Sequence, residues 1–252
     1  MHTTLLVTII MAVYNRQDTI ARALSSLRSQ RYKNIQLIVV DGASDDDTVL
    51  NAQPFLTDRD VLVSEEDKGL YDALNKGLRL ADGDVVGFLH SDDVLPSSDV
   101  LEEVVKRFNE YDVSMVYGDA GFFSGSDPKV LKRYYRSGLF CLRRLAWGHM
   151  PAHPTVYLRR AIYSQIGYFD DTYKIAADYE FLVRLAKNEI KYQYIKRPLI
   201  LMQTGGLSTG GFNSTVRLNR EVKKGLEMNG VYTNWLMLLT KYIIKLRHVV
   251  FK

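Results

Sequence analysis

The sequence predicts an α/β fold in which helices flank a mostly parallel sheet. Short apolar, β-branched runs alternate with segments of helical periodicity over the first 120 residues, which is the pattern of βαβ units. Several of these runs end abruptly in polar residues and carboxylates, as strands do at the ligand-binding edge of an open α/β sheet. The chain has 252 residues, 46% of them apolar and 25% charged, enough for one large or two small domains with a real core.

The first half contains a regular series of expected elements. Strands are predicted at residues 5–13, 35–40, 61–63, 85–89 and 113–117. Between them, apolar residues recur at helical spacing at about 20–27, 70–79 and 100–108, and a short helix is predicted after Asp45–Thr48. This repeated alternation of strands and helices favours parallel strands joined by right-handed crossovers.

The regular alternation of strands and helices ends after Asp119. Residues 130–136 alternate basic and aromatic side chains, and histidines and prolines then interrupt the chain. Helices are expected at 159–166, at 176–185 and from about Ser214. Residues 190–195 and 199–202 are predicted to be a strand pair broken at Pro198, and residues 204–211, with four glycines, a mobile loop.

Composition excludes several classes of protein. A single cysteine, Cys141, rules out a disulfide framework and a thiolate metal site. Residues 1–15 lack a basic leader and a cleavage site, and no apolar run reaches the ~18 residues of a membrane span, so we expect a cytoplasmic protein. The net charge of the chain is +4, and residues 231–252 alone carry a charge of +4. The rest of the chain is therefore neutral overall, which argues against nucleic-acid binding and indicates a basic tail.

Five motifs occur in a characteristic order. They are Val13-Tyr14-Asn15, Asp41-Gly42 with Ser44 and Asp45, the segment 69–77 (GLYDALNKG), Ser91-Asp92-Asp93, and Ala177-Asp178-Tyr179-Glu180. Each motif is weak alone, but the ordered set over about residues 5–210 resembles the family 2 glycosyltransferases. It is most similar to the small bacterial members that assemble O-antigen, capsule or exopolysaccharide repeat units.

This resemblance implies an inverting enzyme with the GT-A fold, a Rossmann-like sheet with a smaller acceptor-side region. Residues 1–120 would form the nucleotide-sugar-binding half and residues 121–212 the acceptor-side and catalytic-base half of the same domain. Residues 213–252 would form a C-terminal helical tail.

The resemblance also implies donor-binding residues. Asp41 would accept a hydrogen bond from the base of the donor, typically uracil N3–H, beside Val13, Tyr14 and Asn15. A turn-forming aspartate is the alternative for Asp41. Two further expected donor contacts are Asn75 and Lys76, for which a polar helix face is an equal alternative.

Asp92 and Asp93 match the metal-binding element of the family, the DxD motif. Asp93 would bind Mn²⁺ or Mg²⁺ directly and Asp92 would face the ribose. The cation would neutralise charge on the departing nucleoside diphosphate. His90 departs from the Asp or Asn common at that position, and an acidic helix cap before Pro96 is the alternative interpretation.

Asp178 matches the catalytic base, which removes the proton of the acceptor hydroxyl. An N-cap for the helix containing Phe181 is compatible with that role, and Glu180 is expected to be secondary. Acceptor or loop contacts are predicted for His153, Gly205, Gly206 and Ser208. The loop would close over the substrates and exclude water.

The expected partners are a nucleotide-sugar donor, UDP-linked, and a lipid-linked saccharide acceptor. The tail combines apolar and basic residues, so it would lie on the anionic inner face of the cytoplasmic membrane or pack on the core. No Gln-x-x-Arg-Trp motif of processive synthases occurs, so we expect a single addition. The alternatives are a nucleotidyltransferase, whose glycine-rich loop is missing after the first strand, and a non-catalytic carbohydrate- or membrane-binding module.

Overall fold

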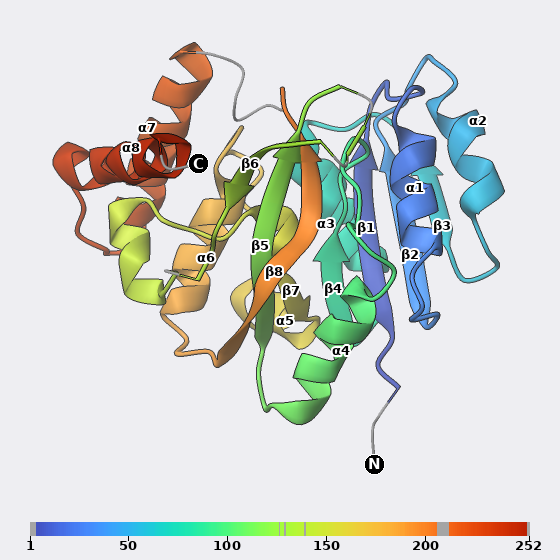
Figure 1. The fold of residues 1–252 in the computed structure, drawn as a ribbon, viewed down its shortest axis with the longest axis horizontal. Coiled ribbons are helices and arrows are strands. Elements are labelled where there is room, and N and C mark those ends of the chain that lie inside the picture. Colours follow the sequence, from blue (N-terminus) through green and yellow to red (C-terminus); the bar gives the residue numbers. More distant parts are fainter. Residues whose placement is uncertain (1–3, 126, 129, 139, 206–211, 251–252) are drawn as a thin grey trace.

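One eight-stranded mixed sheet organises the chain. The computed structural model describes residues 4–125, 127–128, 130–138, 140–205 and 212–250. Its strand order is β3-β2-β1-β4-β7-β5-β6, with β8 paired to β5, and helices cover the sheet (Figure 1). The predicted α/β class is therefore confirmed.

The elements have the following bounds. The strands are β1 (Val7–Val13), β2 (Ile35–Asp41), β3 (Val61–Ser64), β4 (Val85–Phe88), β5 (Met115–Phe123), β6 (Leu131–Tyr135), β7 (Tyr157–Arg159) and β8 (Tyr192–Gln203). The helices are α1 (Ile20–Arg28), α2 (Thr48–Ala52), α3 (Leu70–Leu80), α4 (Val100–Glu110), α5 (Ala161–Ile166), α6 (Ala177–Ala186), α7 (Phe212–Met228) and α8 (Trp235–Val250). Short 3₁₀ turns span Gln53–Phe55, Leu142–Trp147 and His153–Thr155.

Strands β1 to β4 form a parallel unit that aligns their carboxyl ends. β1 pairs with β2 so that Val13 lies opposite Asp41, and with β4 so that Ile10 lies opposite Phe88. α3 lies close on β1 because residue 77 is glycine: a Cβ there would come 2.4 Å from Cγ2 of Ile10. The loops that follow β1, β2 and β4 consequently emerge at one edge of the sheet.

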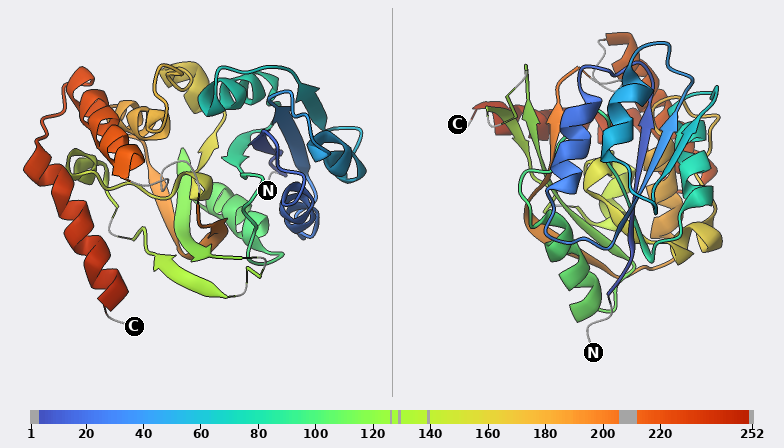
Figure 2. Two further views of the ribbon diagram at one scale, coloured as in Figure 1. Left: turned by 90° about the horizontal axis from the view of Figure 1, so that it is seen from above. Right: turned by 90° about the vertical axis from the view of Figure 1, so that its right-hand side faces the viewer.

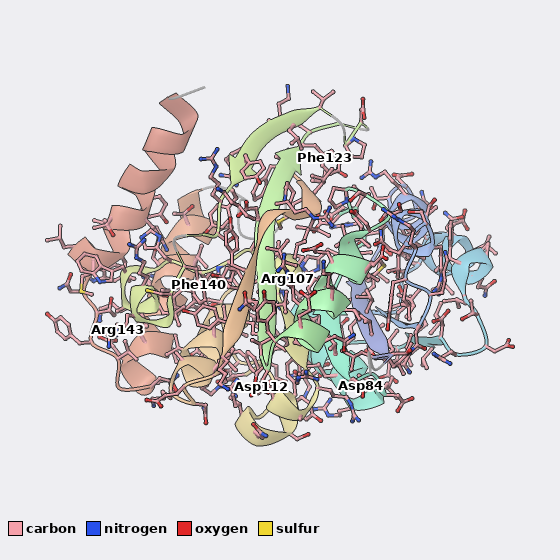
Figure 3. All side chains as sticks on the ribbon, turned by 60° about the horizontal axis from the view of Figure 1, so that its bottom comes forward. Asp84, Arg107, Asp112, Phe123, Phe140 and Arg143 are labelled. Carbon is pink, nitrogen blue, oxygen red and sulfur yellow. The ribbon has the colours of Figure 1, made fainter. Side chains whose placement is uncertain are left out.

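The second half extends the same sheet. β7 pairs antiparallel with both β4 and β5, whereas β8 runs parallel to β5. Asp84 and Asp112, which lie just before β4 and β5, are at one edge, and Phe123 at the end of β5 is at the opposite edge (Figure 3). The predicted strand pair is wrong: β8 continues through Pro198, because shifts in register opposite Asp119 accommodate it.

The C-terminal helices lie at the side of the sheet away from α1 and α2 (Figure 2). α7 packs on α6 through the buried Val222 and Leu226, so it belongs to the core. α8 buries Leu238 while Leu236 and Leu239 are exposed. None of the described helices is long and apolar enough to cross a membrane.

Candidate active site

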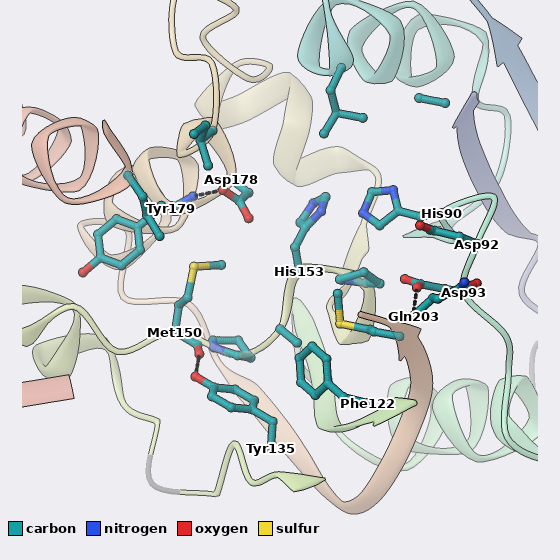
Figure 4. Close-up of a pocket in the computed structure, with 18 of the residues that line it drawn as sticks. His90, Asp92, Asp93, Phe122, Tyr135, Met150, His153, Asp178, Tyr179 and Gln203 are labelled. Carbon is teal, nitrogen blue, oxygen red and sulfur yellow. Dashed lines mark hydrogen bonds between the residues drawn. The ribbon is translucent and has the colours of Figure 1, made fainter. Parts of the chain in front are cut away.

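A large cavity opens where the carboxyl ends of β1 and β4 meet the second half of the chain. Its volume is about 790 Å³, within the usual size of a ligand site. Asp178 and the pair Asp92–Asp93 enter it from opposite sides, with His153 and His90 between them (Figure 4). The fold thus brings residues 85 positions apart in the sequence into one site.

The loop after β1 forms one wall of the cavity. Val13, Tyr14 and Asn15 line it, and the ring of Tyr14 is largely exposed. Asn15 has a positive φ of 48°, a conformation that asparagine adopts more readily than most residues. Its N–H donates to Oγ of Ser44 (2.8 Å), which fixes this turn to the loop after β2.

Asp41 does not face the cavity. It is fully buried at the end of β2 and is absent from the described cavity lining. Its carboxylate accepts hydrogen bonds from the N–H of Ser44 (3.0 Å) and from the hydroxyls of Ser44 and Ser64. The expected bond from Asp41 to a base therefore requires breaking bonds within the protein.

The two expected donor contacts on α3 are used for other purposes. Asn75 is buried; its amide donates to the carbonyl of Phe169 (2.8 Å) and accepts from the N–H of Phe169 (3.0 Å). Lys76 donates to the carbonyl of Glu66 and pairs with Glu65 (2.8 Å). Neither belongs to the described lining of the cavity. Both side chains therefore have a structural role here, and their contact with a donor stays a prediction.

Asp93 is buried with an incomplete set of partners. Oδ1 accepts the N–H of Gln203 (3.1 Å) at the end of β8, whereas Oδ2 has no hydrogen-bond partner within the described structure. Burial, and then the charge of Asp92, raise the pKa of Asp93 well above its ordinary value. Arg22 donates to the carbonyl of Asp92 (3.1 Å) and to Oε1 of Gln203 (2.5 Å), so β8 and α1 hold this loop together.

These carboxylates fit a hard divalent cation. An unpartnered, buried carboxylate oxygen that lines a cavity is a suitable ligand for Mn²⁺ or Mg²⁺. No cluster of three or more potential protein ligands occurs among the residues described. Oxygens from a bound diphosphate and from water would therefore complete the coordination sphere.

Two histidines separate the acidic groups. His153 stacks on Phe88, with ring centroids 4.6 Å apart, and lies 6.1 Å from His90. Burial lowers the pKa of His153 to about 3 and also lowers that of His90. Both rings are consequently neutral at physiological pH, and buried Nε2 of His153 has no hydrogen-bond partner in the described part of the chain.

Asp178 lies in the first turn of α6, where Ala176 rather than Asp178 is the N-cap. Its Oδ1 accepts the N–H of Tyr179 (2.8 Å) and lies 3.0 Å from the hydroxyl of Tyr71. Burial raises the pKa of Asp178 to about 6, against the lowering effect of these hydrogen bonds. A carboxylate with this pKa is well suited to accept a proton near neutral pH.

Glu221 holds the segment that leads into α6, and sequence reasoning did not identify it. Its carboxylate on α7 accepts the N–H groups of Lys174 (3.2 Å), Ile175 (2.8 Å) and Ala176 (3.0 Å). No local motif signals this contact, because it joins segments about 45 residues apart. Glu180, expected to be secondary, pairs with Arg184 (2.9 Å) and is not among the described lining residues.

The second half of the chain contributes several cationic side chains to the cavity lining. Cationic side chains from β6, the 3₁₀ turn, the loop before α6 and α8 line the cavity: Arg133, Arg136, Arg144, Lys174 and Lys241. Of the predicted loop residues, Gly205 has a φ of 111° and does not line the described cavity. Gly206 and Ser208 lie outside the described residues.

Comparison with known proteins identifies relatives of this chain. The profile described as glycosyl transferase family 2 matches residues 8–173. A PGL/p-HBAD biosynthesis glycosyltransferase of Mycobacterium bovis is 29% identical over 225 residues, which are 88% of this chain and 84% of the relative.

Two solved structures have a similar fold. Staphylococcus aureus TarS 1-349 in complex with UDP-GlcNAc has a TM-score of 0.67 at 19% identity, over 87% of this chain. The mannosyltransferase PcManGT of Pyrobaculum calidifontis, in complex with GDP-Man and Mn²⁺, has a TM-score of 0.65 at 22% identity, over 89% of this chain. The matched parts are 66% and 64% of those longer chains.

Replacing Glu221 tests whether its carboxylate stabilises the segment before α6. Glu221→Ala leaves three N–H groups without their acceptor, so the free energy of unfolding should fall by about 1–3 kcal/mol. Hydrogen exchange at residues 174–176 should accelerate. The control Glu227→Ala, on the same helix, removes only an exposed ion pair with Lys223 and should change stability by less than about 0.5 kcal/mol. Equal effects of both substitutions in urea unfolding and hydrogen exchange would contradict the assignment.

Proposed function

The chain belongs to glycosyl transferase family 2, and we propose that it moves one sugar from a UDP-sugar to a lipid-linked saccharide, with inversion at the anomeric carbon. The product would be part of a bacterial surface polysaccharide such as O-antigen, capsule or exopolysaccharide. The observation that carries the proposal is the entry of Asp92–Asp93 and Asp178 into one cavity from opposite sides. Family membership makes the chain a glycosyltransferase, so the nucleotidyltransferase and the non-catalytic module are not retained.

The donor half of the site is assigned to residues 1–120. Val13, Tyr14 and Asn15, which line the cavity, would contact the nucleoside, and Asp92 would face the ribose. Asp93 would hold Mn²⁺ or Mg²⁺ through its unpartnered oxygen. When bound, the cation would supply positive charge against the departing diphosphate. The complex of PcManGT with GDP-Man and Mn²⁺ supports a divalent metal.

Asp178 is assigned as the base, in the half formed by residues 121–212. It accepts the proton of the acceptor hydroxyl while the hydroxyl oxygen bonds to the anomeric carbon. The bond between that carbon and the diphosphate oxygen breaks, and the nucleoside diphosphate leaves from the opposite face. The separation of Asp178 from Asp92–Asp93 across the cavity (Figure 4) suits this in-line displacement.

The cationic residues of the cavity lining support an acceptor that carries phosphate. Arg133, Arg136, Arg144 and Lys174 come from segments that follow the donor half. Cationic side chains attract phosphate and form charge-assisted hydrogen bonds with it. A saccharide joined to a lipid through phosphate carries negative charge, which these residues would attract.

Peripheral membrane association is proposed for residues 213–252. Trp235, Leu236 and Leu239 on α8 are 49%, 77% and 53% exposed, next to the exposed Tyr232. The opposite face of α8 packs on the protein through Leu238. The two alternatives for this helix are therefore compatible, because one face contacts the core and the other remains available to a lipid surface.

Asp93→Ala should abolish metal-dependent binding of nucleoside diphosphate. Calorimetric titration of UDP into the wild type should show tighter binding with Mn²⁺ than without it, and the variant should lose this difference because its metal ligand is gone. Asp58→Ala, on an exposed loop, should retain the difference. A variant at position 93 that still binds UDP in a Mn²⁺-dependent way would refute the metal assignment.

Activity should depend on pH through Asp178. Because its pKa is raised to about 6, Asp178 retains its proton below that pH, so transfer should rise through about pH 6 and level off above it. Asp178→Asn should reduce the transfer rate by about 10²–10⁴-fold with little change in donor affinity. The control Asp171→Asn, at an exposed position, should keep the wild-type rate and pH profile. Normal transfer by the Asp178 variant would show that the base is another group.

Vesicle flotation tests the membrane proposal. Leu236→Ser with Leu239→Ser removes apolar surface from the exposed face of α8, so binding to vesicles with anionic lipid should weaken about tenfold or more. Leu50→Ser is the matched control, since Leu50 on α2 is 61% exposed but lies on the other side of the molecule. Equal flotation of the wild type and the α8 variant would eliminate this surface as the docking site.

A further inference from the structure

Two carboxylates lie close to the loop after β2, and they differ in what they face. Asp41 is buried, accepts three hydrogen bonds from Ser44 and Ser64, and is absent from the described cavity lining. Asp67, in the loop between β3 and α3, is partly exposed and lines the cavity. Only a carboxylate that faces the cavity can bind a ligand without first breaking bonds within the protein.

Gly42 makes room for Asp67. A Cβ at position 42 would come 2.6 Å from Oδ2 of Asp67 and 3.5 Å from Cδ2 of Tyr14, so any side chain there would displace the carboxylate. Oδ1 of Asp67 accepts the N–H of Gly69 (2.7 Å), which fixes its orientation. Within the described residues, Oδ2 has no hydrogen-bond donor.

Asp67 lies where the base of a nucleotide would be expected if the phosphates of that nucleotide were bound at Asp93. β1 lies between β2 and β4, so the loops after β2 and β4 are about 10 Å apart, two strand spacings. Asp92 and Asp93 follow β4, whereas Asp67 lies beside Gly42, which follows β2. A nucleoside diphosphate with its phosphates at Asp93 would extend past Tyr14 toward Asp67.

We propose that Asp67, and not Asp41, recognises the donor base, by accepting the N3–H of a uracil ring. This assignment rests on the proposed nucleotide-sugar donor. One unoccupied carboxylate oxygen matches the single imide N–H of uracil, and the exposed ring of Tyr14 offers a face for stacking. Cytosine presents an acceptor at N3, which the carboxylate repels, and guanine presents two adjacent N–H groups although Oδ1 is already bound to Gly69.

Asp41 then has a positioning role. Its carboxylate orients the hydroxyl of Ser44, and Oγ of Ser44 accepts the N–H of Asn15. This chain of hydrogen bonds holds Asn15 at its positive φ and so places Tyr14 in the cavity wall.

Calorimetric titration of UDP, CDP and GDP in the presence of Mn²⁺ tests the assignment with full-length wild type, Asp67→Asn and Asp41→Asn. Asparagine at position 67 retains the oxygen that binds Gly69 and replaces Oδ2 by an amide, which donates to cytosine N3 and repels uracil N3–H. The wild type should prefer UDP over CDP and GDP by about tenfold or more. In Asp67→Asn the preference for UDP over CDP should disappear or reverse. Asp41→Asn should lower the Tm and retain the preference for UDP.

The outcomes separate this inference from the proposed function. An unchanged ratio of UDP to CDP affinity in Asp67→Asn would overturn the assignment, as would loss of that ratio in Asp41→Asn. A preference of the wild type for GDP would overturn the choice of uracil. A wild type that binds no nucleoside diphosphate would refute the proposed donor itself, and the role of Asp67 with it.

Discussion

The cost of burying carboxylates governs this structure. An ionised carboxylate that leaves water needs hydrogen-bond donors or a cation. Asp119 receives them from the hydroxyls of Tyr134 and Tyr194 (2.8 Å each) and the N–H of Ser137 (2.7 Å), and Asp41 from two serines. Asp93 and Asp178 have fewer protein donors, and their pKa values are raised. The fully bonded carboxylates hold the fold together, whereas the two incompletely bonded ones line the cavity, where a cation or a proton would complete their environment.

Short-range patterns were sufficient to predict the first half of the fold. The β-branched runs and helical spacings located β1 to β4 because local pairing and amphipathicity dominate there. The same patterns divided β8 at Pro198, because they do not reveal that a shift in register opposite Asp119 absorbs the proline. The family resemblance, rather than these patterns, placed Asn75 and Lys76 at the donor. In the structure both lie on α3, and their partners Phe169 and Glu65 are not among the described lining residues of the cavity.

The missing parts of the site depend on tertiary contacts. Glu221 reaches the segment before α6 from another helix, and Gln203 reaches Asp93 from the end of β8. Neither carries a sequence signal, since each acts through geometry that arises only when distant segments pack. The exchange of roles between Asp41 and Asp67 has the same origin: the motif identifies an acidic loop, but burial determines which carboxylate faces the ligand.

The hydrogen bond from the N–H of Gln203 to Asp93 affects how the chain folds during translation. A ribosome releases Asp93 and its flanking strands about 110 residues before Gln203, and at usual elongation speeds that interval lasts several seconds or longer, about 5–20 residues being added each second. The nascent amino-terminal portion therefore exists for a time with its acidic loop unsupported by β8. If Asp93 has the proposed role, its site for metal and nucleotide would be complete only after β8 has been synthesised and has paired with β5.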